Sequence, residues 1–116
     1  MSEYTDLFSS AIGGASRGSG VIAEEVEISR VTLYKAKKSP TAISMRVCEK
    51  VAVACGLGKR DTRALLAAML RGKLEKIPGR LGAAVKVFIK SVDKMPPKVA
   101  ASVWRGAVQR HMEEEA

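Results

Sequence analysis

The sequence contains few aromatic residues, one histidine and two cysteines. Aromatic residues make up 4% of the 116 residues, whereas apolar residues as a whole make up 47%. Such an aliphatic composition suits closely packed helices better than a β-sheet, which favours β-branched and aromatic side chains. We therefore expect an all-α fold.

The same scarcity excludes several kinds of site. Cys48 and Cys55 lie on one predicted helix with their Cα atoms about 10 Å apart, which is beyond disulfide reach. Together with His111 they offer too few ligands for zinc. The sequence has no paired carboxylates, no serine–histidine–aspartate set and no phosphate-binding loop. We expect a protein that is not an enzyme, holds no metal, needs no cofactor and keeps both thiols in its core.

Long apolar runs are also missing. No run approaches the roughly 18 to 20 residues that a membrane-spanning helix requires. The opening segment, MSEYTDLFSS, is acidic and lacks the basic, apolar and small-residue order of a signal peptide. We therefore expect a cytoplasmic protein with no membrane partner.

Acidic residues are fewer than basic ones, and the difference is unevenly distributed. The chain has 20 lysines and arginines against 12 aspartates and glutamates, which gives a net charge of +8. Residues 1–27 hold five acids and one base, whereas residues 28–48 hold five bases and no acid. A chain with this balance is attracted to a polyanion, either nucleic acid or an anionic membrane surface.

Residues 19–36, SGVIAEEVEISRVTLYKA, predict a helix, a turn and a short basic helix. Ala23 is the small residue where the two helices cross, and Ser29 caps the second helix. At 3.6 residues per turn, Leu33 and Ala36 face inward. This is the layout of a helix-turn-helix DNA reader. The outward face and its flanks carry Arg30, Val31, Thr32, Tyr34, Lys35 and Lys38.

The run IAEEVEISRVTLYKA, followed by SPTAISMRVCEKVAVACGLG, resembles the lambda-repressor-like (Cro/C1-type) helix-turn-helix superfamily. The phrase ISRVTLYKA looks closest to the antidote-type regulators of toxin–antitoxin modules. The resemblance covers about residues 5–72 and implies a five-helix DNA-binding scaffold. Two features depart from the family pattern. Glu27 stands in the turn where the family usually has glycine, and the loop KKSP is shorter than in most members.

Periodicity and cap signals predict seven helices. Five belong to a DNA-binding domain of residues 1–73, and two form a C-terminal helical hairpin of residues 74–116. Ser19 and Thr41 are the predicted caps of the second and fourth helices, and Gly72 is predicted to lie just past the fifth. The acidic tail EEEA is expected to fray, because acids at a helix C-terminus oppose the macrodipole. The predicted helices span residues 2–12, 20–26, 30–38, 41–54, 61–71, 79–94 and 97–112.

The predicted DNA contacts divide into two groups. Arg30 is the strongest candidate for reading a base, since its guanidinium matches the two acceptors of guanine. Val31 either meets a thymine methyl or packs on a loop, and Tyr34 either touches DNA or lies on the scaffold. The predicted base-reading residues are Arg30, Val31, Thr32, Tyr34 and Lys35. The predicted phosphate contacts are Ser19, Ser29, Lys37, Lys38 and Arg46.

The predicted hairpin carries more apolar residues than its own closure needs. A soluble monomer rarely exposes such a surface, so we expect a second copy of the chain to cover it. The alternative is that both helices fold back on the fourth and fifth helices and leave nothing exposed. The predicted dimer or partner interface consists of Phe88, Val92, Val103, Trp104 and Val108.

These observations and the resemblance lead to one leading function. We expect a sequence-specific transcriptional regulator, a repressor of phage or mobile-element type, that binds a palindromic operator in double-stranded DNA as a homodimer. The first alternative is the DNA-binding antitoxin of a toxin–antitoxin module, with the hairpin holding the toxin. The second is an adaptor or inhibitor whose basic helices bind an acidic protein instead of DNA.

Overall fold

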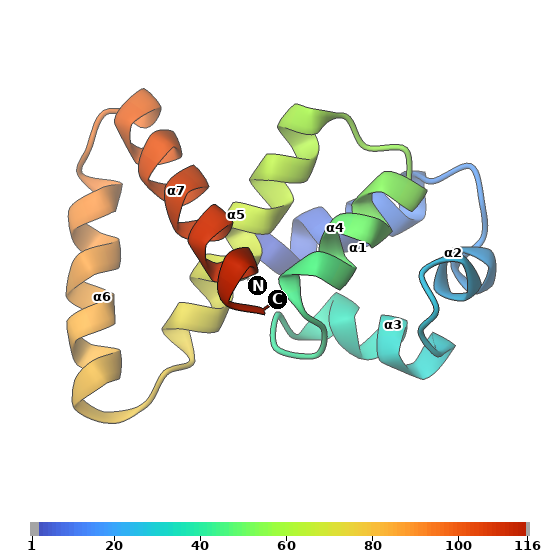
Figure 1. Ribbon diagram of the computed structural model, residues 1–116, viewed down its shortest axis with the longest axis horizontal. Coiled ribbons are helices and arrows are strands. Elements are labelled where there is room, and N and C mark those ends of the chain that lie inside the picture. The colour runs from blue at the N-terminus through green and yellow to red at the C-terminus, as the bar shows by residue number, and fades with distance from the viewer. Residues whose placement is uncertain (1–2, 116) are drawn as a thin grey trace.

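The computed structural model describes residues 3–115 and contains seven helices, with no strand within that range. The prediction of an all-α fold is confirmed. The helices are arranged around α5, which contacts α1, α4, α6 and α7 (Figure 1). The elements are α1 (Glu3–Gly14), α2 (Ser19–Glu25), α3 (Arg30–Lys38), α4 (Met45–Ala54), α5 (Lys59–Glu75), α6 (Gly79–Asp93) and α7 (Pro97–Glu115).

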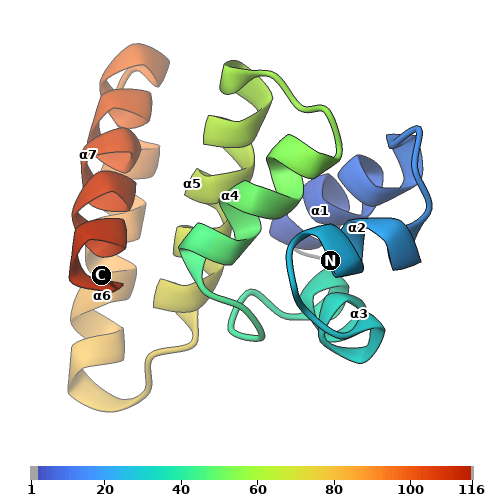
Figure 2. The same ribbon diagram turned by 45° about the vertical axis from the view of Figure 1, so that its right-hand side comes forward.

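Helices α1–α3 lie on one side of α5, and the α6–α7 hairpin stands on the other (Figures 1 and 2). The hairpin does not stand free, because α7 packs against α4 and α5 while α6 packs against α5. One apolar cluster runs through the molecule from Tyr4 in α1 to Val108 in α7. The hairpin therefore shares a core with the five preceding helices.

Helix α1 is held against α3 by its apolar stripe and by one buried hydrogen bond. Tyr4 and Phe8 are fully buried, and their rings lie 5.4 Å apart. The Tyr4 hydroxyl donates to the carbonyl oxygen of Ala36, at 2.6 Å. Burial raises the pKa of Tyr4 well above its usual range, so the hydroxyl keeps the proton that it donates. This bond fixes the C-terminal half of α3 to the scaffold.

The turn between α2 and α3 contains a residue with a left-handed backbone, Glu27 (φ 61°). Two backbone hydrogen bonds close the end of α2, from Glu27 to Glu24 and from Ile28 to Ala23. This is the Schellman arrangement, in which glycine usually takes the left-handed position. The end of α4 has the same two-bond pattern, and there Gly56 supplies the positive φ.

Three predicted helix starts differ from the structure. Gly18, and not Ser19, is the N-cap of α2, because the extended backbone already ends at residue 18. Ser44, and not Thr41, caps α4 by accepting the N–H of Val47 at 3.2 Å. The backbone N–H of Thr41 is instead used in a local turn, where it donates to Ser39. Helix α5 likewise begins two residues before Asp61, after Gly58.

Gly72 does not end α5, which continues to Glu75. A β-carbon at Gly72 would lie 2.8 Å from Cγ of Pro40, so the glycine allows the loop before α4 to cross α5 closely. The predicted domain boundary after residue 73 therefore falls inside a helix. Arg71 of α5 also connects this helix to the hairpin, because its guanidinium donates two parallel 2.8 Å hydrogen bonds to the carboxylate of Asp93 in α6.

The acidic tail was predicted to fray, and this prediction was wrong for the residues that the structure describes. Helix α7 continues to Glu115, whose carboxylate reaches the first turn of α4. A tertiary contact thus stabilises a turn whose own charges disfavour it. None of the helices within residues 3–115 combines the length and the apolar content that crossing a bilayer requires.

Candidate nucleic-acid interface

Helix α3 is buried on one side and open on the other. Leu33 is 2% exposed and Ala36 is fully buried, whereas Val31 is 62% exposed and Tyr34 is 55% exposed. The predicted phase of this helix is therefore confirmed. Its exposed residues are Arg30, Val31, Tyr34, Lys35 and Lys38, and Thr32 and Lys37 are half-buried.

Arg30 does not point straight out from α3. Its guanidinium lies over the first turn of α2, where the Nε atom is 2.7 Å from the position that a β-carbon of Gly20 would take. The absence of a side chain at Gly20 therefore leaves room for the Arg30 guanidinium against α2. A hollow of about 340 Å³ opens beside it, lined in part by Ser19, Val31 and Tyr34. Arg30 itself lines this hollow, so its side chain lies beside the exposed face of α3.

Tyr34 and Lys38 form a pair one turn apart on the outer face. The Lys38 ammonium lies 4.5 Å from the centre of the Tyr34 ring, which is a cation–π contact. Hydrogen bonding with Lys38, and then its charge, lowers the pKa of the Tyr34 hydroxyl. The ring lies along the exposed side of the helix and leaves the core to Leu33 and Ala36.

The hydroxyl groups at the start of α3 serve the helix itself. Ser29 accepts the backbone N–H of Thr32 at 2.9 Å, so the predicted cap is confirmed. The two hydroxyl oxygens are also hydrogen-bonded to each other at 2.8 Å. The Thr32 hydroxyl is therefore already hydrogen-bonded within the chain, whereas the Val31 side chain is exposed on the outer face.

Two lysines of α5 and its C-cap extend the basic surface beyond α3, and the sequence analysis did not predict them. The ammonium of Lys76 donates to the Ser39 hydroxyl at the end of α3, at 3.2 Å. The ammonium of Lys73 donates to the carbonyl oxygen of Ile43 at 3.0 Å. Both were missed because the end of α5 was placed too early. Their spacing of three residues on one helix is the signal that points to a common side.

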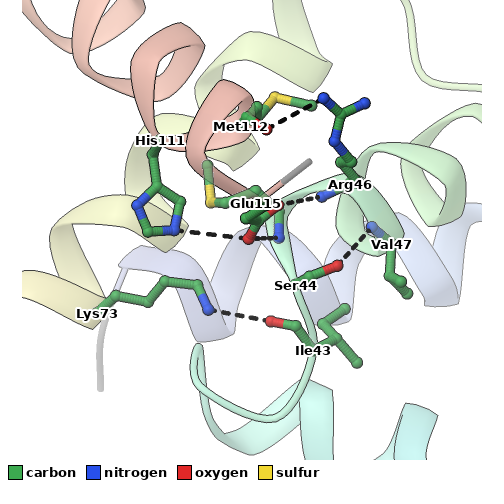
Figure 3. A network of polar contacts seen from close by, with 9 residues as sticks. Ile43, Ser44, Arg46, Val47, Lys73, His111, Met112 and Glu115 are labelled. Carbon is green, nitrogen blue, oxygen red and sulfur yellow. Dashed lines mark hydrogen bonds and ion pairs between the residues drawn. The ribbon is translucent and has the colours of Figure 1, made fainter.

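Arg46, a predicted phosphate contact, is engaged within the chain. Its guanidinium donates to the carbonyl oxygen of Met112 at 3.1 Å (Figure 3). The backbone N–H groups of Met45 and Arg46 donate to the two carboxylate oxygens of Glu115, at 2.9 Å and 3.2 Å. The first turn of α4 therefore already carries a negatively charged group.

The predicted dimer or partner interface needs correction. Val92, Trp104 and Val108 are buried in the chain's own core, because the hairpin packs on α4 and α5. Val103 is half-buried, and Phe88 remains 43% exposed with its ring in edge contact with Trp104. The exposed large apolar residues of the hairpin are Leu81, Val87, Phe88, Met95 and Val99.

A second hollow lies away from α3. Its volume is about 600 Å³, and its walls come from the α1–α2 loop, α2, α4 and α5. Charges of both signs line it, and Arg17 is paired with Glu25 at 2.6 Å and donates to the carbonyl of Ala54 at 2.8 Å. This arrangement joins the α1–α2 loop to the ends of α2 and α4, which is a structural role.

The two cysteines are free thiols in the structure. Cys48 is fully buried in the core and Cys55 is half-buried, so only the first matches the prediction of a core thiol fully. Burial raises the pKa of the Cys48 thiol to about 12. Comparison of the chain with protein-family models, with curated proteins and with solved structures found no match. The geometry above is therefore the basis for a function.

Proposed function

We propose that the protein is a sequence-specific double-stranded DNA-binding regulator that places α3 in the major groove. One observation carries this proposal: α3 is fixed from behind by Leu33, Ala36 and the Tyr4 hydrogen bond, and its outer face is basic and without an acid. The major groove of B-DNA is about 12 Å wide and admits one helix. The positive φ of Glu27 gives further support, because the helix-turn-helix superfamily that the sequence resembles usually has glycine at this turn position, and glycine favours that backbone conformation.

The residues of α3 divide by chemistry in the proposed complex. Arg30 reads a guanine, and Val31 contacts a thymine methyl. Tyr34 lies along the bases or the backbone, held by Lys38. The proposed base contacts remain Arg30, Val31, Thr32, Tyr34 and Lys35. The proposed phosphate contacts are Ser19, Ser29, Lys37 and Lys38, together with Lys76, which lies beside the end of α3.

The proposed regulator acts as a repressor and binds its operator as a homodimer. One α3 helix contacts one half-site, and two half-sites lie about 34 Å apart on one face of the duplex. The exposed apolar residues of the hairpin, with Phe88 and Val87 on α6, are the proposed dimer surface in place of the buried set.

An acidic protein partner for the hairpin is a second candidate, favoured by the charges of α6. Lys86, Lys90 and Lys94 are all exposed, and the neighbouring Asp93 is taken by Arg71. A symmetric pair of α6 helices brings like charges together, which opposes dimerisation. Sedimentation of the full chain at tens of micromolar decides between the two. A dimer supports self-association, and a monomer supports the acidic partner.

Selection from a randomised duplex library tests the DNA proposal. The full chain is expected to enrich one motif, and Arg30→Ala is expected to lose preference at one base pair at a cost of about 1–3 kcal/mol. Lys38→Ala serves as the matched control, since loss of a phosphate contact weakens all sequences about equally. Failure to enrich any motif would remove the proposal, and an unchanged motif with Arg30→Ala would remove the role of Arg30.

A further inference from the structure

The hollow between α4 and α5 lies outside the surfaces to which the proposed function gives a role. Among the described residues, none of α3, α6 or α7 lines it. Its volume of about 600 Å³ falls within the range of about 300 to 1,000 Å³ that small-molecule sites occupy. The end of α4 and the start of α5 form its two long walls, and the short loop 55–58 joins them (Figure 1). The hollow is therefore large enough for a small molecule.

Much of the lining of this hollow is apolar. Val26 and Leu66 are core residues, 8% and 4% exposed, and both reach its surface. Ala54 and Leu57 are half-buried and line it as well. Val53, on the α4 wall, is 67% exposed, more than any other large apolar residue that the structure describes. An apolar ligand body in the hollow would cover these side chains, and removing apolar surface from water favours binding.

The charged residues around this lining carry an excess of base. Arg17 and Glu25 neutralise each other in the 2.6 Å ion pair between the α1–α2 loop and α2. One further acid, Glu49, lines the hollow together with three further bases. All three bases are exposed, and none of them makes a hydrogen bond or an ion pair within residues 3–115. These bases are Lys50, Lys59 and Arg63.

Each long wall places a base beside an apolar side chain. Lys50 precedes Ala54 by four residues on α4, and Arg63 precedes Leu66 by three on α5, spacings that make neighbours on a helix. The half-buried Thr62 adds a hydroxyl group on the α5 wall. The excess of base disfavours a cationic ligand, and an anion without an apolar part would leave the apolar lining uncovered. The lining therefore suits a molecule that combines an apolar body with one negative charge.

We propose that this hollow binds a small amphipathic acid. Its carboxylate lies between Lys50 and Arg63, which are exposed at the mouth of the hollow, and its apolar body covers Val53 and reaches toward Val26 and Leu66. Charge-assisted hydrogen bonds from the two bases hold the carboxylate. The proposed site does not depend on DNA binding by α3.

Amide resonances of the full chain test the site, with octanoate as the probe. Octanoate is expected to shift the amides of Val53, Ala54 and Thr62 in a saturable way. Two matched probes each lack one part of it, because 1-octanol has no charge and acetate has no apolar body. Both are expected to bind about 10-fold or more weakly. Equal affinities for octanoate and 1-octanol, or octanoate shifts confined to the hairpin, would overturn the proposal.

Removal of the two bases tests how the carboxylate is held. The double variant Lys50→Gln with Arg63→Gln is compared with Lys98→Gln with Arg105→Gln, which makes the same changes at exposed positions of α7 outside the hollow. The first variant is expected to bind octanoate about 5-fold or more weakly than the second, with no difference for 1-octanol. Equal octanoate affinities would overturn the proposal, because net charge alone would then determine binding.

An exposed valine tests how the apolar body is held. Val53→Ser is expected to weaken octanoate binding about 3-fold, because part of the apolar lining is lost. Val21→Ser is the matched control, since Val21 is 51% exposed on α2 and lies outside the hollow. Both side chains are exposed, so neither change opens the core. Equal octanoate affinities of these two variants would place the apolar body elsewhere and overturn the proposal.

Discussion

Helices α1–α5 and the α6–α7 hairpin bury their apolar residues to different extents. Nine of the ten largest fully buried side chains belong to α1–α5, and Val92 is the one that the hairpin contributes. Conversely, the hairpin supplies five of the nine exposed large apolar residues. The first region supplies most of the shared core, and the open face of α3 is one of its exposed surfaces. The hairpin packs on α4 and α5 with one side and exposes apolar residues on the other, as a binding surface for another molecule would.

The largest expected effect contrasts one phenylalanine from each region. Phe8→Ala removes a fully buried ring and is expected to cost about 3–5 kcal/mol of unfolding free energy. Phe88→Ala is expected to cost about 1 kcal/mol, because the ring is 43% exposed. Urea unfolding monitored by circular dichroism measures both. Equal losses would remove the contrast between a closed and a half-covered region.

Two glycines of the hairpin allow a crowded position to be compared with an open one inside the same region. A β-carbon at Gly82 would overlap the carbonyl oxygen of Ile77, whereas Gly106 has open space around it. Gly82→Ala is therefore expected to destabilise the protein by about 1–3 kcal/mol. Gly106→Ala, in an exposed helix interior, is expected to stabilise it by about 0.5–1 kcal/mol. Thermal unfolding of the two variants measures the difference, and a stabilising Gly82→Ala would contradict the close approach.

The Tyr4 hydrogen bond links burial in α1 to the position of α3. Tyr4→Phe is expected to cost about 1–2 kcal/mol, because the Ala36 carbonyl loses its buried donor. The raised pKa also has a pH consequence. Above pH about 10 the unfolded chain loses a proton that the folded Tyr4 keeps, so stability falls as the pH rises.

Unfolding measured across alkaline pH checks this sign. The decline above pH about 10 is expected to be weaker in Tyr4→Phe than in the unchanged protein. Tyr34→Phe is the control, and its alkaline decline is expected to be at least as steep as in the unchanged protein, because the pKa of Tyr34 is lowered and not raised in the folded chain. The same alkaline decline in all three proteins would show that Tyr4 does not contribute to it.

The smallest expected effect concerns the two left-handed turns. Glu27→Gly is expected to stabilise the protein by about 0.5–1 kcal/mol, since glycine takes a positive φ without steric cost. Gly56→Ala provides the reverse change at the matching end of α4, where the surroundings are open. It is expected to destabilise by about 1 kcal/mol. A loss of stability with Glu27→Gly would mean that the glutamate side chain contributes more than its backbone strain costs.

The spacing of apolar residues in the sequence correctly predicted which side of α3 faces the core. Leu33 and Ala36 were placed inward because their spacing on α3 admits one buried face, and the structure has them there. The start of α2 was misplaced because its cap, Gly18, makes no side-chain hydrogen bond that the sequence could signal. The start of α4 was misplaced because several hydroxyl residues precede that helix. Thr41 and Ser44 offer the same capping chemistry, and the local turn at Ser39 decides between them.

Contacts between distant segments could not be predicted in this way. Gly72 reads as a helix stop, yet it is the place where Pro40 approaches α5. The contact of Glu115 with α4 opposes the local preference of an acidic helix end, so the sequence pointed to fraying. Lys76 joins the surface of α3 only because α5 is longer than its cap signals indicated.

The central claim is that the open face of α3 binds DNA, and two charge reversals test it most directly. Lys35→Glu changes the exposed face of α3, and Lys59→Glu makes the same change at the start of α5, which lies at the top of the view in Figure 1 whereas α3 lies at the bottom. Affinity for the selected duplex at fixed salt is the measurement. We expect Lys35→Glu to lose about 10-fold or more and Lys59→Glu to lose much less. Equal losses would contradict the account, because net charge and not α3 would then determine binding.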